Sequence, residues 1–299
     1  MENIRLKRSS LYVSGANPAH MIQAAFYNED CLVYDLEDSV PDTEKDAARL
    51  LVYNAIKYHR PGDKYIMIRV NGMHTGFFSE DLEAAVHARP DAIRIPKVEN
   101  PEDVRYISAQ INSIEREAGI EPGSTKLWCN IESYLGLINA YEIATADPRV
   151  TAMALGAEDF TVSIRARRTK SGIEILYARS MLLIACRHAG VDAIDAVFPD
   201  ISDIDGLKED SLLARNLGFD GKSCIHPRQV DIVNSSFTPD QKEIKYALRV
   251  IEAIEEGKRL KKGAVTLDGS MIDKPVELRA RTALAQATAA GLPTGGAES

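Results

Sequence analysis

The sequence predicts an α/β fold: a TIM (β/α)8 barrel with a C-terminal helical extension that serves as a lid. Eight short β-branched or aliphatic runs recur along the chain, which is the strand number of such a barrel, and stretches with helical spacing separate them. Most of these runs are continuously apolar, as expected for a parallel sheet covered on both faces. The expected strands are 11–14, 31–36, 65–70, 92–96, 126–131, 151–155, 193–198 and 221–225.

Helix start signals lie between the expected strands. Asn17-Pro18 and Asn100-Pro101 each place a capping asparagine before a proline at the first helical turn. After the second signal, apolar residues recur at spacings of three and four, which predicts a helix packed on the sheet. These residues are Val104, Ile107, Ile111 and Ile114.

The chain continues past the eighth expected strand. Helical periodicity predicts a helix over 239–260, and a second helix is expected over about 275–289. Between them, 263–270 is interpreted as an irregular or extended connection in a strand-free lid, in which Gly269 permits hinge motion.

Length sets the expected domain organisation. The 299 residues accommodate one barrel of about 250 residues plus an extension, and no linker or internal repeat is evident. We expect the barrel over residues 1–235 and the helical extension over 236–299, with disorder at 291–299.

Composition excludes some classes of function. The formal net charge of -8 provides no basic footprint for nucleic acid. No apolar run reaches the ~18 residues of a membrane span, and no signal-peptide core follows the charged start, so we expect a cytoplasmic protein outside the membrane. The cysteines show no CxxC spacing and are expected to be reduced core residues. They are Cys31, Cys129, Cys186 and Cys224.

Carboxylates at two strand ends predict a metal site. The C-terminal ends of barrel strands converge on one rim, so residues far apart in sequence meet there. Glu132 and Asp159 follow neighbouring expected strands, and two carboxylates are enough for Mg²⁺, which completes its octahedron with water and substrate oxygens. Alternatively, each carboxylate stabilises the first turn of the following helix.

Arg69 ends the third expected strand and is a candidate for bidentate capture of a substrate carboxylate. Alternatively, it forms a structural ion pair with an acid of the run Asp35-Leu36-Glu37-Asp38 after the second strand, and the two roles are compatible. Within this run, Glu37 is assigned to the catalytic group because it would orient Arg69 and metal-bound water.

Two further strand-end residues are candidates for chemistry. Lys97 would form a Schiff base in one class of barrel aldolases, or, beside Pro96 and Glu99, it is a charged member of an ion-pair network. His226 follows the eighth expected strand and is a candidate acid or base, although a structural histidine is the favoured interpretation.

Nine motifs, in order along the chain, resemble the citrate lyase beta subunit family. This family belongs to the metal-dependent HpcH/HpaI aldolase-like barrels, which also include malyl-CoA and citramalyl-CoA lyases. The similarity runs from about Lys7 to Ala289, and the loop 161–171 departs from it by being more basic. The motifs are Ser9 to Pro18, Asp35-Leu36-Glu37-Asp38, Glu44-Lys45-Asp46-Ala47-Ala48-Arg49, Arg69-Val70-Asn71, Ile95-Pro96-Lys97, Ile131-Glu132-Ser133, Gly156-Ala157-Glu158-Asp159, Gly218-Phe219-Asp220-Gly221-Lys222-Ser223 and Met271-Ile272-Asp273.

The resemblance implies a Mg²⁺-dependent carbon–carbon lyase that acts on a 3-hydroxyacyl thioester. It implies Glu132 and Asp159 as metal ligands and Arg69 and Glu132 as substrate contacts. Asp273 would be an acid/base carboxylate on a lid that reaches the site of an adjacent subunit. The expected reaction cleaves citryl-CoA or citryl-acyl carrier protein to oxaloacetate and an acetyl thioester. The expected assembly is a homotrimer or hexamer, with a citrate lyase alpha subunit and an acyl carrier protein as partners.

Other functions remain open at the level of sequence. A malyl-CoA or citramalyl-CoA lyase would use the same residues with a different pocket, and a malyl-CoA thioesterase would use the metal to activate water. A non-catalytic carrier-docking subunit is the alternative of another class. The presence of the metal pair, Arg69 and Asp273 argues against it.

Overall fold

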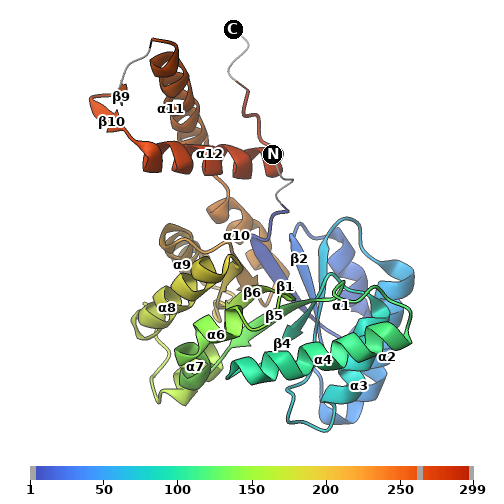
Figure 1. Ribbon diagram of the computed structural model, residues 1–299. Helices are drawn as coiled ribbons and strands as arrows, with labels where there is room; N and C mark the ends of the chain where they lie inside the picture. The colour runs from blue at the N-terminus through green and yellow to red at the C-terminus, as the bar shows by residue number, and fades with distance from the viewer. Residues whose placement is uncertain (1–4, 261–264, 296–299) are drawn as a thin grey trace. The chain divides into compact units, whose positions relative to one another are not determined.

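The structure is a computed structural model that describes residues 5–260 and 265–295 (Figure 1). Eight parallel strands pair in chain order and close into a barrel, which confirms the predicted fold. Each strand begins and ends within three residues of its expected position. The strands are β1 (Ser9–Ser14), β2 (Cys31–Asp35), β3 (Tyr65–Arg69), β4 (Ala92–Ile95), β5 (Lys126–Ile131), β6 (Val150–Leu155), β7 (Asp192–Asp195) and β8 (Gly221–Cys224).

Helices follow the strands and surround the barrel (Figure 1). Both predicted asparagine caps are present, since Asn17 accepts from the His20 N–H and Asn100 from the Asp103 N–H. The helices of the barrel unit are α1 (Pro18–Gln23), α2 (Lys45–His59), α3 (Phe78–Ala88), α4 (Pro101–Glu117), α5 (Tyr134–Ile138), α6 (Ala140–Ala144), α7 (Ala157–Ser163), α8 (Ile173–Ala189) and α9 (Ile204–Leu217), with 3₁₀ turns η1 (Ala24–Phe26), η2 (Asp42–Glu44) and η3 (Pro227–Gln229). Along α4, the predicted apolar stripe is buried except at its last position, where Ile114 is half-buried.

Side chains fill the interior of the barrel. Trp128 is fully buried and stacks on Tyr65 with ring centroids 5.5 Å apart. Small and branched apolar residues from other strands complete this cluster. The cysteines are all free and buried, as expected, and burial raises the pKa of the Cys129 and Cys224 thiols to about 12. Because the core is filled by side chains, the chemistry of the barrel is confined to its ends.

Contacts within the chain divide it into a barrel unit, Lys7–Asn234, and a second unit that contains the described residues from Ser235 onward together with Arg5 and Leu6. In the second unit, α11 (Gln241–Arg259) packs against α12 (Lys274–Ala289) through Val250, Ile254 and Ala280, among others. A further helix, α10 (Val230–Phe237), follows the barrel's last 3₁₀ turn. The expected disorder at 291–299 falls partly on 296–299, which lie outside the described residues.

The prediction of a strand-free connection between these helices was wrong. β9 (Val265–Leu267) and β10 (Ser270–Ile272) form an antiparallel hairpin, and Asp268 and Gly269 at its turn both have positive φ. A two-residue Asp-Gly turn with positive φ at both positions matches the right-handed twist of the flanking strands. The dipeptide was therefore a hairpin signal that the sequence interpretation missed. Positions 263 and 264 of the expected connection lie outside the described residues.

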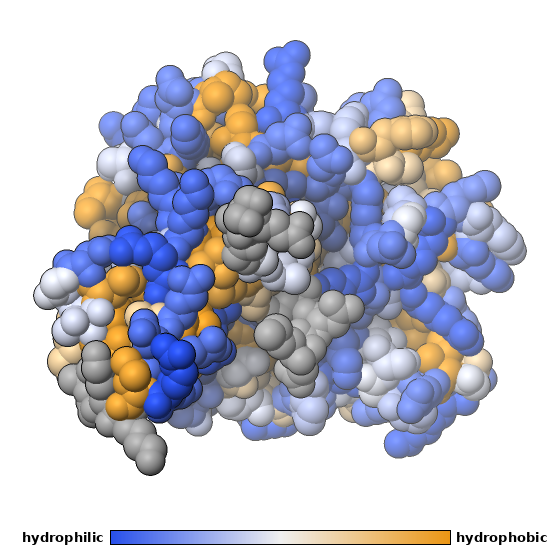
Figure 2. All heavy atoms as spheres, turned by 90° about the horizontal axis from the view of Figure 1, so that it is seen from above, coloured by the Kyte–Doolittle hydropathy of each residue, from blue (hydrophilic) through white to orange (hydrophobic). Residues whose placement is uncertain are grey.

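On the face shown in Figure 2, hydrophilic residues predominate and apolar areas lie between them. None of the described helices is long and apolar enough to cross a membrane.

Candidate active site

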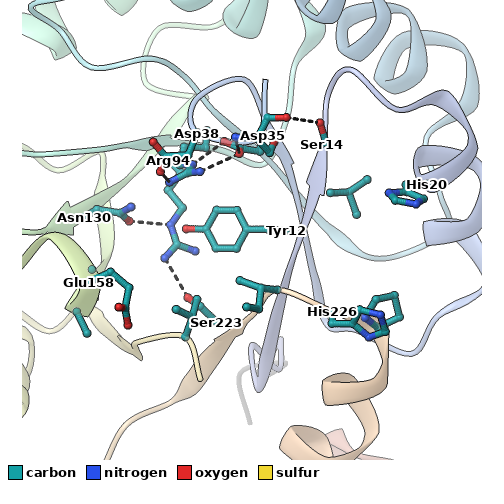
Figure 3. A pocket seen from close by; sticks show the side chains of 18 of the residues that line it. Tyr12, Ser14, His20, Asp35, Asp38, Arg94, Asn130, Glu158, Ser223 and His226 are labelled. Carbon is teal, nitrogen blue, oxygen red and sulfur yellow. Dashed lines mark hydrogen bonds and ion pairs between the residues drawn. The ribbon is translucent and has the colours of Figure 1, made fainter. Parts of the chain in front are cut away.

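A cavity of about 830 Å³ opens where the barrel strands end (Figure 3). Its lining comes from the C-terminal ends of the strands or the residues that follow them, so the rim that the sequence predicted is the rim that is hollowed. Arg69, Glu132, Asp159 and His226 all line this cavity. The structure therefore brings together residues up to 157 positions apart in sequence.

Glu132 lies directly after β5 and is 5% exposed. Its Oε1 accepts a hydrogen bond from Asn130 Nδ2 at 2.9 Å. Burial, followed by repulsion from Glu37, raises the pKa of Glu132 to about 8, although Asn130 and Arg69 oppose the shift. Among the described residues, no lysine or arginine forms an ion pair with Glu132, so the attraction of Arg69 does not offset its burial.

Gly156 gives Glu132 the room it occupies. A Cβ at Gly156 would lie 2.4 Å from Glu132 Cγ, a separation that side chains do not tolerate. The backbone of Gly156 has φ -93°, so its role is to leave space rather than to adopt an unusual conformation. Glycine at the end of β6 therefore lets the carboxylate of β5 lie across the neighbouring strand.

Asp159 lies in the first turn of α7, and its side chain is 54% exposed. Its Oδ2 is 3.9 Å from Lys97 Nζ. The alternative in which Glu132 caps a helix is contradicted, because Ser133 is the residue that caps α5, accepting from the Gly136 N–H. For Asp159, the position in a first helical turn is compatible with both the capping and the metal interpretation.

Glu132 and Asp159 fit a magnesium ion. Carboxylate oxygens are the protein ligands that Mg²⁺ prefers, and it usually takes one or two of them. The burial of Glu132, which outweighs the attraction of Arg69 and raises the pKa of the carboxyl group, is the observation that supports such a site. Among the described residues, no three His, Cys, Asp or Glu side chains are grouped to hold a metal ion. The remaining ligands would thus be water or substrate.

Arg69 is bound to the acids of the preceding strand end. Its Nε and Nη2 donate to the two Asp35 carboxylate oxygens at 2.6 and 2.8 Å, and its Nη1 lies 2.8 Å from Glu37 Oε2 and 3.2 Å from Asp38 Oδ2. Burial works against the charge, but Asp35 outweighs it, so the pKa of Arg69 is well above its usual value. The structural ion pair considered from sequence is therefore present, on a residue that also lines the cavity.

Glu37 bridges Arg69 and Lys97, whose Nζ lies 2.9 Å from Glu37 Oε1. Neither Glu37 nor Lys97 is among the residues that line the cavity. Burial disfavours the charge of Lys97, but Glu37 raises the pKa of the amine, the opposite of what a Schiff-base lysine requires. The ion-pair interpretation of Lys97 fits the structure, although the partners are Glu37 and Asp159. Glu99 instead accepts from the Ser133 hydroxyl.

His226 and Asp273 both cap helical turns. His226 Nδ1 accepts from the Arg228 N–H at the start of η3, which fits the structural interpretation of this histidine. Asp273 belongs to the second unit, where its Oδ1 accepts from the Val276 N–H at the start of α12. Its acid/base role stays a prediction.

The sequence interpretation did not single out Tyr12 and Arg94, which both line the cavity. Arg94 is the third residue of β4 and is 2% exposed, and the Tyr12 ring lies 4.9 Å from its guanidinium and 4.8 Å from that of Arg69 (Figure 3). The available signal was a charged residue inside the short apolar run Ile93-Arg94-Ile95, since alternation along a strand directs such a residue into the barrel or the helix layer.

The basic loop after α7 is tied to neighbouring acids. Arg168 donates to Glu158, which lines the cavity, and to Glu174 at the start of α8, while Lys170 pairs with Asp203. The additional positive charge of this loop, which departs from the family pattern, is therefore partly neutralised by ion pairs beside the cavity.

The barrel with acids and arginines at its C-terminal rim defines an enzyme of the metal-dependent aldolase and lyase type. The chain belongs to the HpcH/HpaI aldolase/citrate lyase family, whose model matches residues 8–227. It is 42% identical to the citrate lyase subunit beta of Leuconostoc mesenteroides subsp. cremoris, over 97% of this chain and 96% of that protein. It is 43% identical to the citrate lyase subunit beta of Escherichia coli K12, over 96% and 95%.

More distant relatives widen the comparison. The (3S)-malyl-CoA thioesterase of Cereibacter sphaeroides is 34% identical over 94% of this chain and 95% of that protein. Among solved structures, the CitE protein of Mycobacterium tuberculosis in complex with magnesium, acetoacetate and coenzyme A is 30% identical, with a TM-score of 0.78 over 95% of this chain and 100% of that one. The family and the enzyme class are thus established, and the protein is a lyase-family enzyme.

Proposed function

We propose that the protein cleaves a citryl thioester, citryl-CoA or citryl-acyl carrier protein, to oxaloacetate and an acetyl thioester in a Mg²⁺-dependent carbon–carbon lyase reaction. The observation that carries this proposal is the identity of 42–43% over nearly the whole chain to proteins named citrate lyase subunit beta, against 34% to a malyl-CoA thioesterase. The cavity, its two carboxylates and its arginines supply the groups that such a reaction needs.

Glu132 and Asp159 would hold the metal at the rim. When bound, Mg²⁺ supplies Lewis-acid chemistry: it gathers carboxylate and hydroxyl oxygens and lowers the pKa of the hydroxyl. Glu132 would be deprotonated in that state because a cation restores the counter-charge that burial denies it. Asp159 is half-exposed and lines the cavity, so its carboxylate is accessible to an ion there.

Arg69 and Asp273 would stabilise and then neutralise the negative charge that develops during cleavage. Loss of the hydroxyl proton to solvent water would form the carbonyl group of the 2-oxoacid as the adjacent carbon–carbon bond breaks, and the electron pair of that bond would pass to the thioester as an enolate. Arg69 would stabilise this negative charge, while Glu37 holds its guanidinium from the far side. Asp273, on the C-terminal lid, would deliver the proton that converts the enolate into an acetyl thioester.

A thioesterase is the second candidate, favoured by the 34% identical relatives of that name. In that reaction the same carboxylates would serve an activated water that attacks the thioester carbon, and the carbon skeleton would stay intact. The products distinguish the two reactions, because a thioesterase releases the hydroxy acid and a free thiol.

Partners and compartment belong to the same proposal. The relatives are named as beta subunits, which supports a multisubunit assembly. The family resemblance implies an alpha subunit and an acyl carrier protein as its other members. We further propose a homotrimer or hexamer, a cytoplasmic location, and a lid role for the unit beyond residue 235. Shared sites between neighbouring chains would require such an oligomer.

The test is a substrate panel. Purified protein is incubated with citryl-, malyl- and citramalyl-CoA, each with Mg²⁺ and with chelator, and 2-oxoacid, acetyl-CoA and free thiol are quantified separately. We expect oxaloacetate and acetyl-CoA from citryl-CoA, with Mg²⁺ only. Malate and free thiol from malyl-CoA would establish the thioesterase instead, and inactivity on all three substrates, with citryl-acyl carrier protein also inert, would overturn the proposal.

A further inference from the structure

Arg94 is a buried positive charge with neutral partners. It is 2% exposed, and in the part of the chain that the structure describes no carboxylate lies within ion-pairing distance of its guanidinium. Its Nε donates to Asn130 Oδ1 at 2.7 Å and its Nη2 to Ser223 Oγ at 3.1 Å, while Nη1 has no hydrogen-bond partner. Burial lowers the pKa of the guanidinium from its usual value.

Such an arrangement costs stability. A buried charge without an opposite charge is expensive, and replacing it by an apolar side chain of similar length is often neutral or stabilising. An arginine that served only the core would therefore be a poor choice in β4. The cost points to a role at the cavity that Arg94 lines.

A chain of hydrogen bonds leads from Arg94 to the candidate metal ligand. Arg94 pairs in register with Trp128 on β5, and Asn130, two residues further, projects from the same face of that strand. Because Asn130 Oδ1 accepts from Arg94, its Nδ2 faces Glu132 and donates to Oε1. Figure 3 shows the Arg94 guanidinium reaching both Asn130 and Ser223 beside the ring of Tyr12.

We propose that Arg94 is a positioning residue that, through Asn130, holds the Glu132 carboxylate in the orientation that binds the metal. The inference rests on the proposed function, in which Glu132 is a metal ligand. Without the Arg94 donor, the Asn130 side chain loses the hydrogen bond that fixes its oxygen, and with it the orientation of its Nδ2. The Glu132 carboxylate then loses the donor that holds it in position. The stacked Tyr12 ring, 4.9 Å away, fixes the plane of the guanidinium.

Charge and positioning predict opposite effects on metal affinity. If Arg94 acted only through its charge, its removal would strengthen binding of a cation, since like charges repel. If it acts through Asn130, its removal weakens binding. Residues that orient metal ligands typically change affinity by about 10- to 100-fold when they are lost.

The test measures Mg²⁺ affinity calorimetrically in the absence of substrate, together with the melting temperature in chelator. For Arg94→Met, we expect the dissociation constant to rise at least about tenfold while the melting temperature stays at or above that of the wild type. Ser223→Ala is the matched control, because it removes the other hydrogen bond of Arg94 and leaves the link to Glu132 intact. Its affinity should stay within about threefold of the wild type.

A double-mutant cycle tests the route. If Arg94 acts through Asn130, then Arg94→Met combined with Asn130→Ala should bind Mg²⁺ no more weakly than Asn130→Ala alone. Unchanged or tighter binding by Arg94→Met, unfolding of that variant in chelator, or additive effects in the cycle would overturn the inference.

Failure of the proposed metal site has a different signature. If the wild type does not bind Mg²⁺, or if Glu132→Gln binds it as well as the wild type, the metal site itself is wrong. If Glu132→Gln loses binding and Arg94→Met retains it, only the positioning role fails.

Discussion

At the scale of single residues, burial decides the chemistry of Glu132. Its carboxylate is enclosed beside Gly156 and receives one hydrogen bond from Asn130, and its pKa rises to about 8. In the apo protein near neutral pH, a substantial fraction of this group is therefore protonated, and a metal ion must displace that proton to bind. Metal affinity should accordingly increase as the pH rises.

A substitution at Asp159 can distinguish an effect on metal binding from an effect on the stability of the fold. Because its side chain is half-exposed and, within the described part of the chain, its one ion-pair partner is Lys97 at 3.9 Å, Asp159→Asn should abolish metal-dependent activity and leave the melting temperature in chelator nearly unchanged. Activity assays and thermal unfolding check this. Glu158→Gln is the control, since the neighbouring carboxylate pairs with Arg168 and its loss should preserve Mg²⁺ affinity. A variant of Asp159 that unfolds would instead support a purely structural carboxylate.

Gly156 provides a steric test of the same site. In Gly156→Ala, the new methyl group would meet Glu132 Cγ at 2.4 Å and force the carboxylate aside, so Mg²⁺ affinity should fall by about tenfold or more. Gly76→Ala is the matched control, because a Cβ there has no neighbour within 4 Å and its φ is not in the left-handed region. Equal affinities of the two variants in calorimetry would show that Glu132 does not need its present position.

At the scale of elements, buried ion pairs tie the helices to the strands. Glu115 of α4 is fully buried and accepts from the N–H groups of Gly123 and Thr125, ahead of β5, and from Arg149, ahead of β6. Burial alone would raise its pKa, but the hydrogen bond from Arg149 and those from the backbone lower the pKa to about 2. One carboxylate thus fixes the start of two strands whose far ends carry Glu132 and Asp159.

The depressed pKa of Glu115 predicts a pH-dependent contribution to stability. A lowered folded-state pKa stabilises the fold above the usual value of 4.5, and this contribution disappears as the pH falls toward about 2. Glu115→Gln should therefore melt well below the wild type at pH 7, and the difference should shrink progressively between pH 4.5 and 2. Thermal unfolding across this range is the measurement. Glu117→Gln, at an exposed position of the same helix, should melt like the wild type throughout.

At the scale of the whole molecule, the open question is whether the C-terminal unit completes a site. Asp273→Asn is a suitable probe because asparagine caps helices about as well as aspartate, so α12 should persist. We expect this variant to bind thioester and metal normally and to lose cleavage. Both binding affinities and turnover would be measured on the intact protein.

Mixing variants tests whether neighbouring chains share the site. Under subunit-exchange conditions, Asp273→Asn combined with Asp159→Asn should recover up to about a quarter of wild-type activity, since hybrid sites combine an intact metal pair with an intact lid. Each variant alone, and the mixture without exchange, are the controls. Lack of rescue when exchange is demonstrated would return Asp273 to an in-chain role or to helix capping alone.

Local sequence patterns were sufficient to predict the barrel, the order of its strands and the rim on which the candidate site lies. Apolar runs and helix caps can be recognised within short stretches of sequence, and a parallel barrel places the C-terminal ends of all its strands on one side. The hairpin turn at Asp268 and Gly269 could also have been predicted, because the positive φ that it requires at both residues is favoured by the Asp-Gly dipeptide itself. Residue roles that rest on resemblance alone, such as that of Asp273, are not set by these patterns.

Which strand-end residues touch depends on how the barrel closes. Closure of the barrel aligns Asp35 with Arg69 in register, which gives the arginine its bidentate partner. It also brings Arg94 beside Asn130, so that the charged residue within an apolar run is linked through hydrogen bonds to Glu132, the proposed metal ligand. These contacts depend on the stagger between strands distant in sequence, and burial then shifts pKa values according to the neighbours so assembled. A local pattern contains no information about either.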